Sequence, residues 1–118
     1  MGIKIGQLHP RNIVHGDLTT ANAIINKKNN ELTFIDFGLA KFTEKVEDKA
    51  VDLHLLDRNL ESSHHTLYPE IFDKVVEAYS IECPDAKEVT ERIEKVAGRR
   101  RPTKKNIDQY DYFIFLSS

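Results

Sequence analysis

The chain has one cysteine, no tryptophan, no long apolar run and little net charge. Cys83 alone cannot form an intrachain disulfide, which favours a reducing, intracellular setting. No apolar stretch approaches the roughly 20 residues that span a bilayer, and the N-terminus has no apolar segment typical of a secretory signal. A net charge of −2 predicts no general attraction to nucleic acid or membrane, so any basic surface has to be local. We therefore expect a cytoplasmic protein, or a nuclear one in a eukaryote, with no membrane partner.

The remaining composition is that of one globular domain, with 40% hydrophobic and 31% charged residues among 118. Two short apolar runs, 23–26 and 32–35, flank a polar turn and predict a β-hairpin. Three patterns with helical spacing follow, beginning near Glu47, Pro69 and Asp85. We expect an α+β fold that is mainly helical, with a small β-hairpin on a helical body.

The predicted helices have apolar inner faces. These are Val51, Leu55, Leu56 and Leu60 in the first helix, Phe72, Val75, Val76 and Tyr79 in the second, and Val89, Ile93 and Val96 in the third. Asp85 and Glu88 have the spacing of a capping box at the start of the third helix, and Gly98 is its expected end.

Three oxygen-bearing side chains are the candidates for chemistry. Asp17 and Asn22 lie in the turn-forming stretch HGDLTTAN, and Asp36 follows the second strand of the hairpin. Mg²⁺ prefers hard oxygen ligands and keeps several waters, so one carboxylate and one amide suffice beside the oxygens of ATP. The hairpin would bring Asn22 and Asp36 to one edge, leaving Asp17 to receive or orient a hydroxyl proton during phosphoryl transfer. The alternative is ordinary turn chemistry, because Asp and Asn both favour loops.

The order of HGDLTTAN and then IDFG resembles the protein-kinase family, in which His-Arg-Asp-Leu, three residues, Asn and then Asp-Phe-Gly recur. The resemblance implies that Asp17 is the catalytic base and that Asn22 and Asp36 bind the metal and the nucleotide. It also implies that His15 and Asp52 are structural supports of the loop, whereas a merely exposed Asp52 is the alternative.

Two departures narrow the resemblance. Gly16 replaces the arginine that pairs with a phosphorylated activation loop in many kinases, so we expect no regulation of that kind. Eight residues separate Gly38 from the stretch EDKAVDL at 47–53, which leaves no room for a full activation segment. With a short helical end and a basic run, the chain is similar to the small atypical kinase family of the KEOPS complex, also called the PRPK type.

That resemblance implies a serine/threonine kinase or ATPase that supports threonylcarbamoyl-adenosine formation in tRNA. The implied partner is the threonylcarbamoyl-transferase subunit of the complex. The basic run could contact tRNA phosphates, although such a run is more commonly a solvated chain end. Its cations are Arg99, Arg100, Arg101, Lys104 and Lys105.

The resemblance covers a C-terminal lobe alone, with the N-terminal lobe absent, because 14 residues precede His15 and they contain no glycine-rich loop. We expect residues 1–98 to form a kinase-like C-lobe, 99–105 a basic tail and 106–118 an extension of unknown role, and ATP to bind weakly to this chain alone. Two rival functions remain open. One is a non-catalytic docking module for the transferase and tRNA, and the other is a small-molecule phosphotransferase of the aminoglycoside or choline type.

Overall fold

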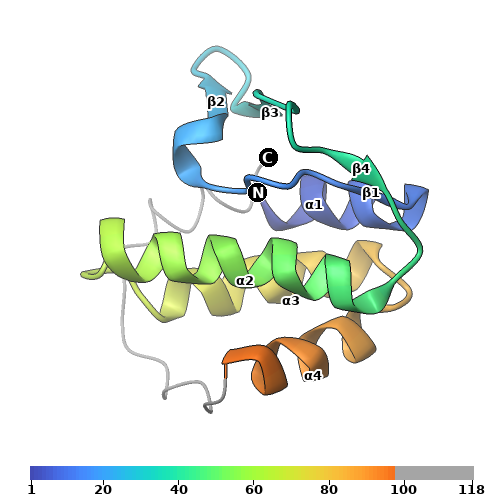
Figure 1. Ribbon diagram of the computed structural model, residues 1–118. Helices are drawn as coiled ribbons and strands as arrows, with labels where there is room; N and C mark the ends of the chain where they lie inside the picture. The colour runs from blue at the N-terminus through green and yellow to red at the C-terminus, as the bar shows by residue number, and fades with distance from the viewer. Residues whose placement is uncertain (98–118) are drawn as a thin grey trace.

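The computed structural model describes residues 1–97, so the basic tail, the C-terminal extension and Gly98 lie outside the described part. The elements are α1 (Gly2–Leu8), the 3-10 helix η1 (His9–Arg11), β1 (Ile13–Val14), the 3-10 helix η2 (Thr20–Asn22), β2 (Ala23–Asn26), β3 (Glu31–Phe34), β4 (Lys41–Phe42), α2 (Val46–Ser63), α3 (Glu70–Glu82) and α4 (Ala86–Ala97). The fold is α+β and mainly helical, as predicted, with the small strands lying on one side of the helical layers (Figure 1). No helix in this part of the chain has the length and apolar character needed to cross a bilayer.

The predicted hairpin is present as β2 and β3, paired antiparallel with Ala23 opposite Phe34 and Asn26 opposite Glu31. The turn closes through a hydrogen bond of 2.7 Å from the Asn30 amide to the Asn26 carbonyl oxygen. Asn30 has a φ of 57°, a left-handed conformation that asparagine tolerates better than most residues. The polar residues between the two apolar runs therefore serve the turn.

A second strand pair was not predicted. β1 pairs antiparallel with β4, with Ile13 opposite Phe42 and Val14 opposite Lys41. Each strand has two residues, so neither carries a periodic pattern of its own. The pair ties the segment before His15 to the segment that leads into α2.

The core lies among the four helices. α1 packs on α3, and α4 packs on α2. Gly6 allows the close approach of α1 to α3, because a Cβ there would lie 2.7 Å from Glu82 Cβ. The largest fully buried apolar side chains are Met1, Ile5, Leu18, Leu53, Leu56, Leu60, Ile71, Phe72 and Tyr79.

The predicted inner face of α2 was partly wrong. Val51 is 50% exposed and Leu55 is half-buried, whereas Lys49, Asp52 and Leu53 are buried. The error arose because Lys49 and Asp52 are charged and so were not counted as interior positions. Both have partners inside the protein, which is what allows a charged group to be buried.

The inner faces of α3 and α4 agree with the prediction where the structure describes them. Phe72, Val75 and Tyr79 are buried in α3, while Val76 is half-buried. In α4 the buried apolar residues include Val89 and Ile93. The described residues show no side-chain hydrogen bond of a capping box at its start. The carboxylate of Asp85 instead lies 3.7 Å from the ammonium of Lys49.

Candidate active site

His15 connects the two motifs that the sequence singled out. Its imidazole is fully buried, Nδ1 accepts a hydrogen bond from the Asp17 amide at 3.1 Å, and Nε2 donates to the Ile35 carbonyl oxygen at 2.8 Å. These partners assign the neutral tautomer with the proton on Nε2, because an amide can only donate and a carbonyl can only accept. One side chain therefore joins the backbone at residue 17 to the residue before Asp36.

Aromatic packing holds the same imidazole from the hairpin side. The ring centroid of His15 lies 4.6 Å from that of Phe37 and 5.8 Å from that of Phe34. Phe34 ends β3 and Phe37 follows Asp36 directly, so the DFG segment is packed against the HGD loop.

Asn22 closes the loop from its other end. Its side-chain Nδ2 donates to the Asp17 carbonyl oxygen at 2.8 Å and to the Asp17 carboxylate at 3.0 Å. The Asn22 backbone carbonyl accepts from the Ile35 amide at 2.9 Å. The structure thus brings Asp17, Asn22 and the residue before Asp36 together through three hydrogen bonds. The Oδ1 oxygen of Asn22 accepts no hydrogen bond from any described residue.

Asp36 combines an exposed side chain with an unusual backbone conformation. It is exposed, and its φ of 59° lies in the left-handed region, which costs a non-glycine residue roughly 1 kcal/mol. No hydrogen bond within residues 1–97 engages its carboxylate. Both oxygens are therefore available to a ligand that lies outside the chain.

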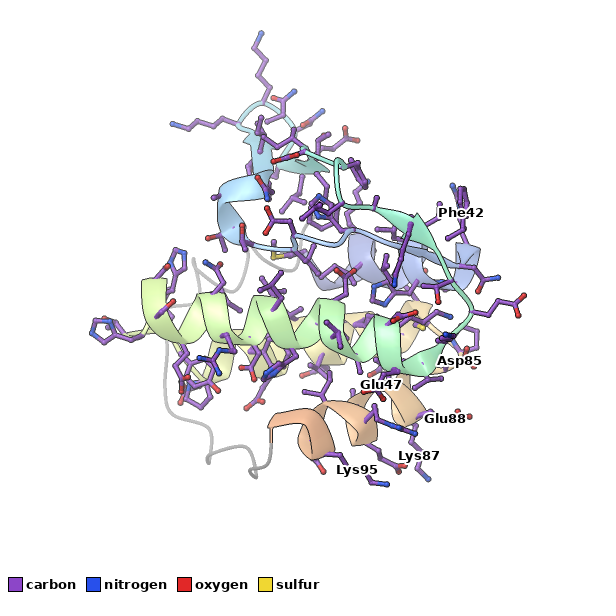
Figure 2. All side chains as sticks on the ribbon, viewed as in Figure 1. Phe42, Glu47, Asp85, Lys87, Glu88 and Lys95 are labelled. Carbon is purple, nitrogen blue, oxygen red and sulfur yellow. The ribbon has the colours of Figure 1, made fainter. Side chains whose placement is uncertain are left out.

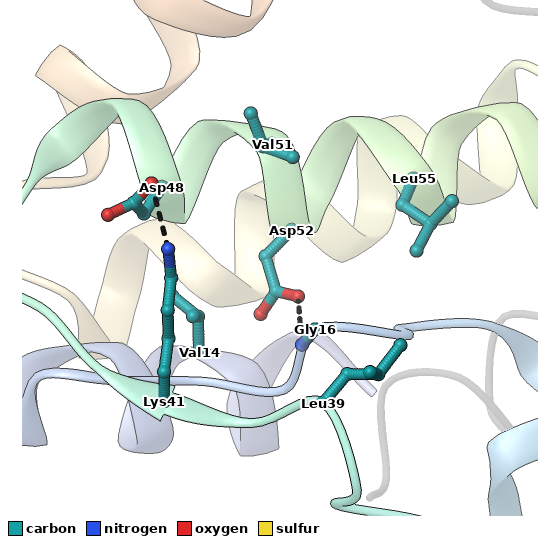
Figure 3. A pocket seen from close by; sticks show the side chains of 8 residues that line it. All are labelled: Val14, Gly16, Leu39, Lys41, Asp48, Val51, Asp52 and Leu55. Atoms are coloured by element: carbon teal, nitrogen blue, oxygen red, sulfur yellow. Dashed lines mark hydrogen bonds and ion pairs between the residues drawn. The ribbon is translucent and has the colours of Figure 1, made fainter.

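Asp52, on α2, supports the HGD loop through hydrogen bonds to its backbone. Its Oδ2 accepts hydrogen bonds from the His15 amide at 3.0 Å and from His9 Nε2 at 2.9 Å. Its Oδ1 accepts from the Gly16 amide at 3.0 Å, and Figure 3 shows this contact. The carboxylate is buried, so these three donors replace the water that it loses. Asp52 thus makes the backbone contact that the kinase resemblance implies, and its importance for catalysis remains a prediction.

Gly16 is required by space as well as by conformation. Its φ is 90°, and a Cβ there would overlap the Leu39 carbonyl oxygen and lie 2.6 Å from the Leu39 carbonyl carbon. From the sequence, Gly16 was notable for the missing arginine. The structure adds that the segment after DFG lies directly on the loop, where no side chain fits.

A groove of about 270 Å³ lies beside Gly16, between β4 and α2. Figure 3 shows its walls, with Leu39 and Lys41 on one side and Val51 and Leu55 on the other. Phe42, 82% exposed, follows Lys41 at the edge of the molecule (Figure 2).

A second groove, of about 390 Å³, lies between α1 and the hairpin, and it reaches Phe37. Apolar side chains are also exposed at the site itself, namely Ile24 (54%), Ile35 (39%) and Phe37 (44%). An exposed apolar patch at a functional site indicates a surface that a further segment or ligand covers.

The charged residues at the start of α2 all have partners within the chain. Glu47 pairs with Arg92 at 3.0 Å, and Asp48 accepts a hydrogen bond from the Thr43 hydroxyl at 2.6 Å. Lys49 is buried near Asp85, as described above.

Sequence reasoning missed two contacts of the loop. His64 is half-buried, with Nε2 3.1 Å from the Thr20 hydroxyl. His9 is fully buried, and its Nε2 lies 2.9 Å from the Asp52 carboxylate. Both partners lie far away in the sequence, so no local pattern could have identified them.

The donor set at this edge fits magnesium better than a metal held by protein alone. The described residues contain no group of three His, Cys, Asp or Glu side chains that could hold a metal ion. Asn22 Oδ1 and the Asp36 carboxylate are hard oxygen donors with no described partners. Mg²⁺ commonly takes one or two protein ligands and completes its shell with nucleotide oxygens and water.

Comparisons with known proteins find relatives among the subunits of the KEOPS complex. It is 43% identical over 103 residues to the KEOPS complex subunit Bud32 of Pyrococcus abyssi, a match that covers 86% of this chain and 46% of that protein. It is 40% identical over 101 residues to the EKC/KEOPS complex subunit bud32 of Dictyostelium discoideum, covering 86% of this chain and 40% of the relative. The chain is a homologue of the KEOPS subunit Bud32.

Other relatives join the Bud32-like region to further sequence. A probable bifunctional tRNA threonylcarbamoyladenosine biosynthesis protein of Methanothermobacter thermautotrophicus is 42% identical over 103 residues, which cover 87% of this chain and 18% of that protein. No protein-family model matches the chain. The chain spans less than half the length of the Bud32 proteins that it matches, consistent with the C-terminal portion of an atypical kinase.

Proposed function

We propose that this chain carries the phosphoryl-transfer half of an atypical serine/threonine kinase or ATPase of the KEOPS type. The observation that supports the proposal best is the link among Asp17, Asn22 and the residue before Asp36, made by the Asn22 side chain, its backbone and the His15 imidazole. Turn chemistry alone would leave the two motifs independent of each other.

In this proposal Asp17 is the catalytic base. Its carboxylate accepts the proton of the attacking hydroxyl or water, and the Asn22 amide holds that carboxylate in place from 3.0 Å. Phosphoryl transfer requires alignment and charge neutralisation more than covalent help, so a fixed carboxylate matters more than a strongly basic one.

Asn22 Oδ1 and the Asp36 carboxylate would hold Mg²⁺. When bound, the ion neutralises the phosphate oxygens of ATP. Asp36 is exposed and keeps a left-handed backbone, and the hydrogen bond from the Ile35 amide to the Asn22 carbonyl holds the neighbouring backbone in place. His15 and Asp52 are the supports that keep the loop and the DFG segment in register.

The nucleotide site is completed by sequence outside this chain. Its Bud32 homologues are more than twice as long as the matched region, and the apolar side chains of Ile24, Ile35 and Phe37 are exposed beside the proposed metal ligands. We propose that a further segment, in a longer form of this chain or in a second polypeptide, covers these side chains and forms the other wall of the ATP pocket. The isolated chain should then bind ATP weakly.

The relatives' names supply the biological setting of the proposal. The chain would act in a KEOPS-type complex that makes threonylcarbamoyladenosine in tRNA, in the cytoplasm or nucleus, bound to the threonylcarbamoyl-transferase subunit. The division into a C-lobe (1–98), a basic tail (99–105) and an extension (106–118) belongs to the same proposal. So does tRNA contact by Arg99, Arg100, Arg101, Lys104 and Lys105.

Titration of the full-length protein with Mg-ATP, followed by ATP hydrolysis, tests the proposal. Asp17→Asn should bind Mg-ATP normally and lose hydrolysis, whereas Asp36→Asn should lose magnesium-dependent binding. If the wild-type protein neither binds nor hydrolyses ATP, the result would indicate the docking module instead. Transfer to an aminoglycoside or choline, with none to protein, would indicate the small-molecule phosphotransferase.

A further inference from the structure

A buried chain of polar side chains continues beyond His9, away from the site. The Tyr79 hydroxyl lies 2.7 Å from His9 Nδ1, and Cys83 Sγ lies 3.3 Å from the same hydroxyl. The rings of His9 and Tyr79 meet edge to face, with centroids 5.4 Å apart and an interplanar angle of 80°. His9, Tyr79, Cys83 and Asp52 are all buried. The chain therefore runs from α3 to the loop that bears Asp17, through the interior.

With a neutral His9, the chemistry of these groups gives the chain a single direction. The Asp52 carboxylate can only accept, so the proton of His9 lies on Nε2. Nδ1 of neutral His9 can then only accept, and the Tyr79 hydroxyl has to donate to it. The thiol of Cys83 donates to the Tyr79 oxygen. Burial is the largest cause of a raised pKa of Tyr79, which keeps the phenol protonated as this arrangement requires.

We propose that Tyr79 is a positioning residue for the HGD loop, acting through His9 and Asp52. Its consequence for catalysis rests on the function proposed above, whereas its effect on the loop does not. The Asp52 carboxylate sets the His9 tautomer, and the hydroxyl holds the imidazole in the orientation that presents N–H to Asp52 Oδ2. Asp52 in turn accepts from the His15 and Gly16 amides, which immediately precede Asp17.

A phenylalanine at position 79 would fill the same space but could not hold the His9 ring by a hydrogen bond. Nδ1 of His9 would be left buried without a donor, and the ring would gain from turning toward another one. Turning withdraws one donor from Asp52 and loosens its hold on the loop. The role belongs to the hydroxyl and not to the volume of the ring.

Amide hydrogen exchange in the full chain tests the proposal without relying on activity. Tyr79→Phe should speed exchange at the His15 and Gly16 amides about tenfold more than at the hairpin amides. The matched control is Val75→Ala, which truncates a buried side chain of the same helix with no atom in the polar chain. It should speed exchange throughout the core, without preference for the loop. Equal profiles in the two variants would overturn the proposal.

A second measurement uses the wild-type chain, in case Tyr79→Phe fails to fold. Nitrogen-15 spectra of the His9 side chain should show a protonated Nε2 and an unprotonated Nδ1. The opposite tautomer, or a doubly protonated ring at neutral pH, would overturn the proposal.

The catalytic consequence is measured in the full-length protein. Tyr79→Phe should lower kcat for ATP hydrolysis about tenfold with little change in KM, while Val75→Ala leaves kcat unchanged at temperatures where it stays folded. An unaltered kcat alongside a loosened loop would overturn the catalytic part. If the wild-type protein hydrolyses no ATP, the proposed function fails, and the exchange and tautomer results still decide the positioning role.

Discussion

The side-chain amide of Asn22 donates to both the carbonyl oxygen and the carboxylate of Asp17, at 2.8 and 3.0 Å. The two ends of the loop are thereby fixed to each other. The same contacts orient the carboxamide, so that its oxygen, and not its nitrogen, is left for a metal ligand. One residue therefore positions the proposed base and supplies part of the proposed magnesium site.

Replacing Asn22 by alanine should destabilise the protein as well as abolish magnesium binding. Two half-buried hydrogen bonds are lost and the Asp17 carbonyl loses its donor, so the free energy of unfolding should fall by about 1–2 kcal/mol. Urea denaturation measures the loss. Asn29→Ala is the control, because Asn29 is an exposed turn residue whose hydrogen bond water can replace. Equal losses in both variants would contradict the structural role given to Asn22.

Gly16→Ala should be strongly destabilising. The left-handed φ of 90° and the overlap of a new Cβ with the Leu39 backbone both oppose the side chain, and we expect a loss of about 2 kcal/mol or more. Thermal or urea unfolding measures it.

Gly38→Ala provides the control for this change. A Cβ at Gly38 would meet only the Asp36 carboxylate, at an ordinary 3.4 Å, so this variant should stay within about 0.5 kcal/mol of the wild type. A Gly16→Ala variant as stable as Gly38→Ala would show that the segment after DFG does not lie on the loop.

Asp36→Gly should make the protein more stable while removing a proposed metal ligand. Glycine adopts the φ of 59° without steric cost, and we expect a net gain of up to about 1 kcal/mol, reduced by the greater freedom of glycine in the unfolded chain. Asp36→Asn should leave stability nearly unchanged, because asparagine tolerates the same conformation. Denaturation without nucleotide measures both variants. A loss of stability in Asp36→Gly would mean that the carboxylate has a structural partner.

Most of the secondary structure could be predicted because its signals are local. The hairpin is two apolar runs around a polar turn, and α3 carries Phe72, Val75 and Tyr79 at helical spacing. The β1–β4 pair could not be predicted, because each strand is two residues long and its partner lies far along the chain. In α2, the buried charges of Lys49 and Asp52 concealed the inner face.

The candidate residues and the supports His15 and Asp52 could be named from the motifs and the family resemblance, but the groups behind Asp52 could not. His9 reaches the loop through Asp52, and Tyr79 through His9, and contacts that span 43 and 70 residues leave no local pattern. Gly16 could be read as a missing arginine, and only the structure shows the Leu39 backbone that excludes a side chain.

The contact between Thr43 and Asp48 should make the stability of the folded protein depend on pH. The hydrogen bond from the Thr43 hydroxyl is the largest cause of a pKa of Asp48 below its ordinary value of 3.8, and Lys41 adds to it. The unfolded state, with the higher pKa, binds more protons near that value, so stability rises as pH rises through this range. The contribution is fully present above about pH 4 and is lost as pH falls through the lowered pKa of the folded state.

Thr43→Val removes the hydroxyl and should therefore cost about 0.5 kcal/mol at neutral pH, a small value because solvent screens Asp48. The difference in stability from wild type should shrink as the pH falls below the pKa of Asp48 in the unfolded state, since Asp48 then becomes protonated in both proteins. Urea denaturation at a series of pH values between 2 and 7 measures the difference, with Thr33→Val as the exposed hairpin control. A difference between wild type and Thr43→Val that stays constant across this range would show that the hydroxyl contributes through packing and not through the charge of Asp48.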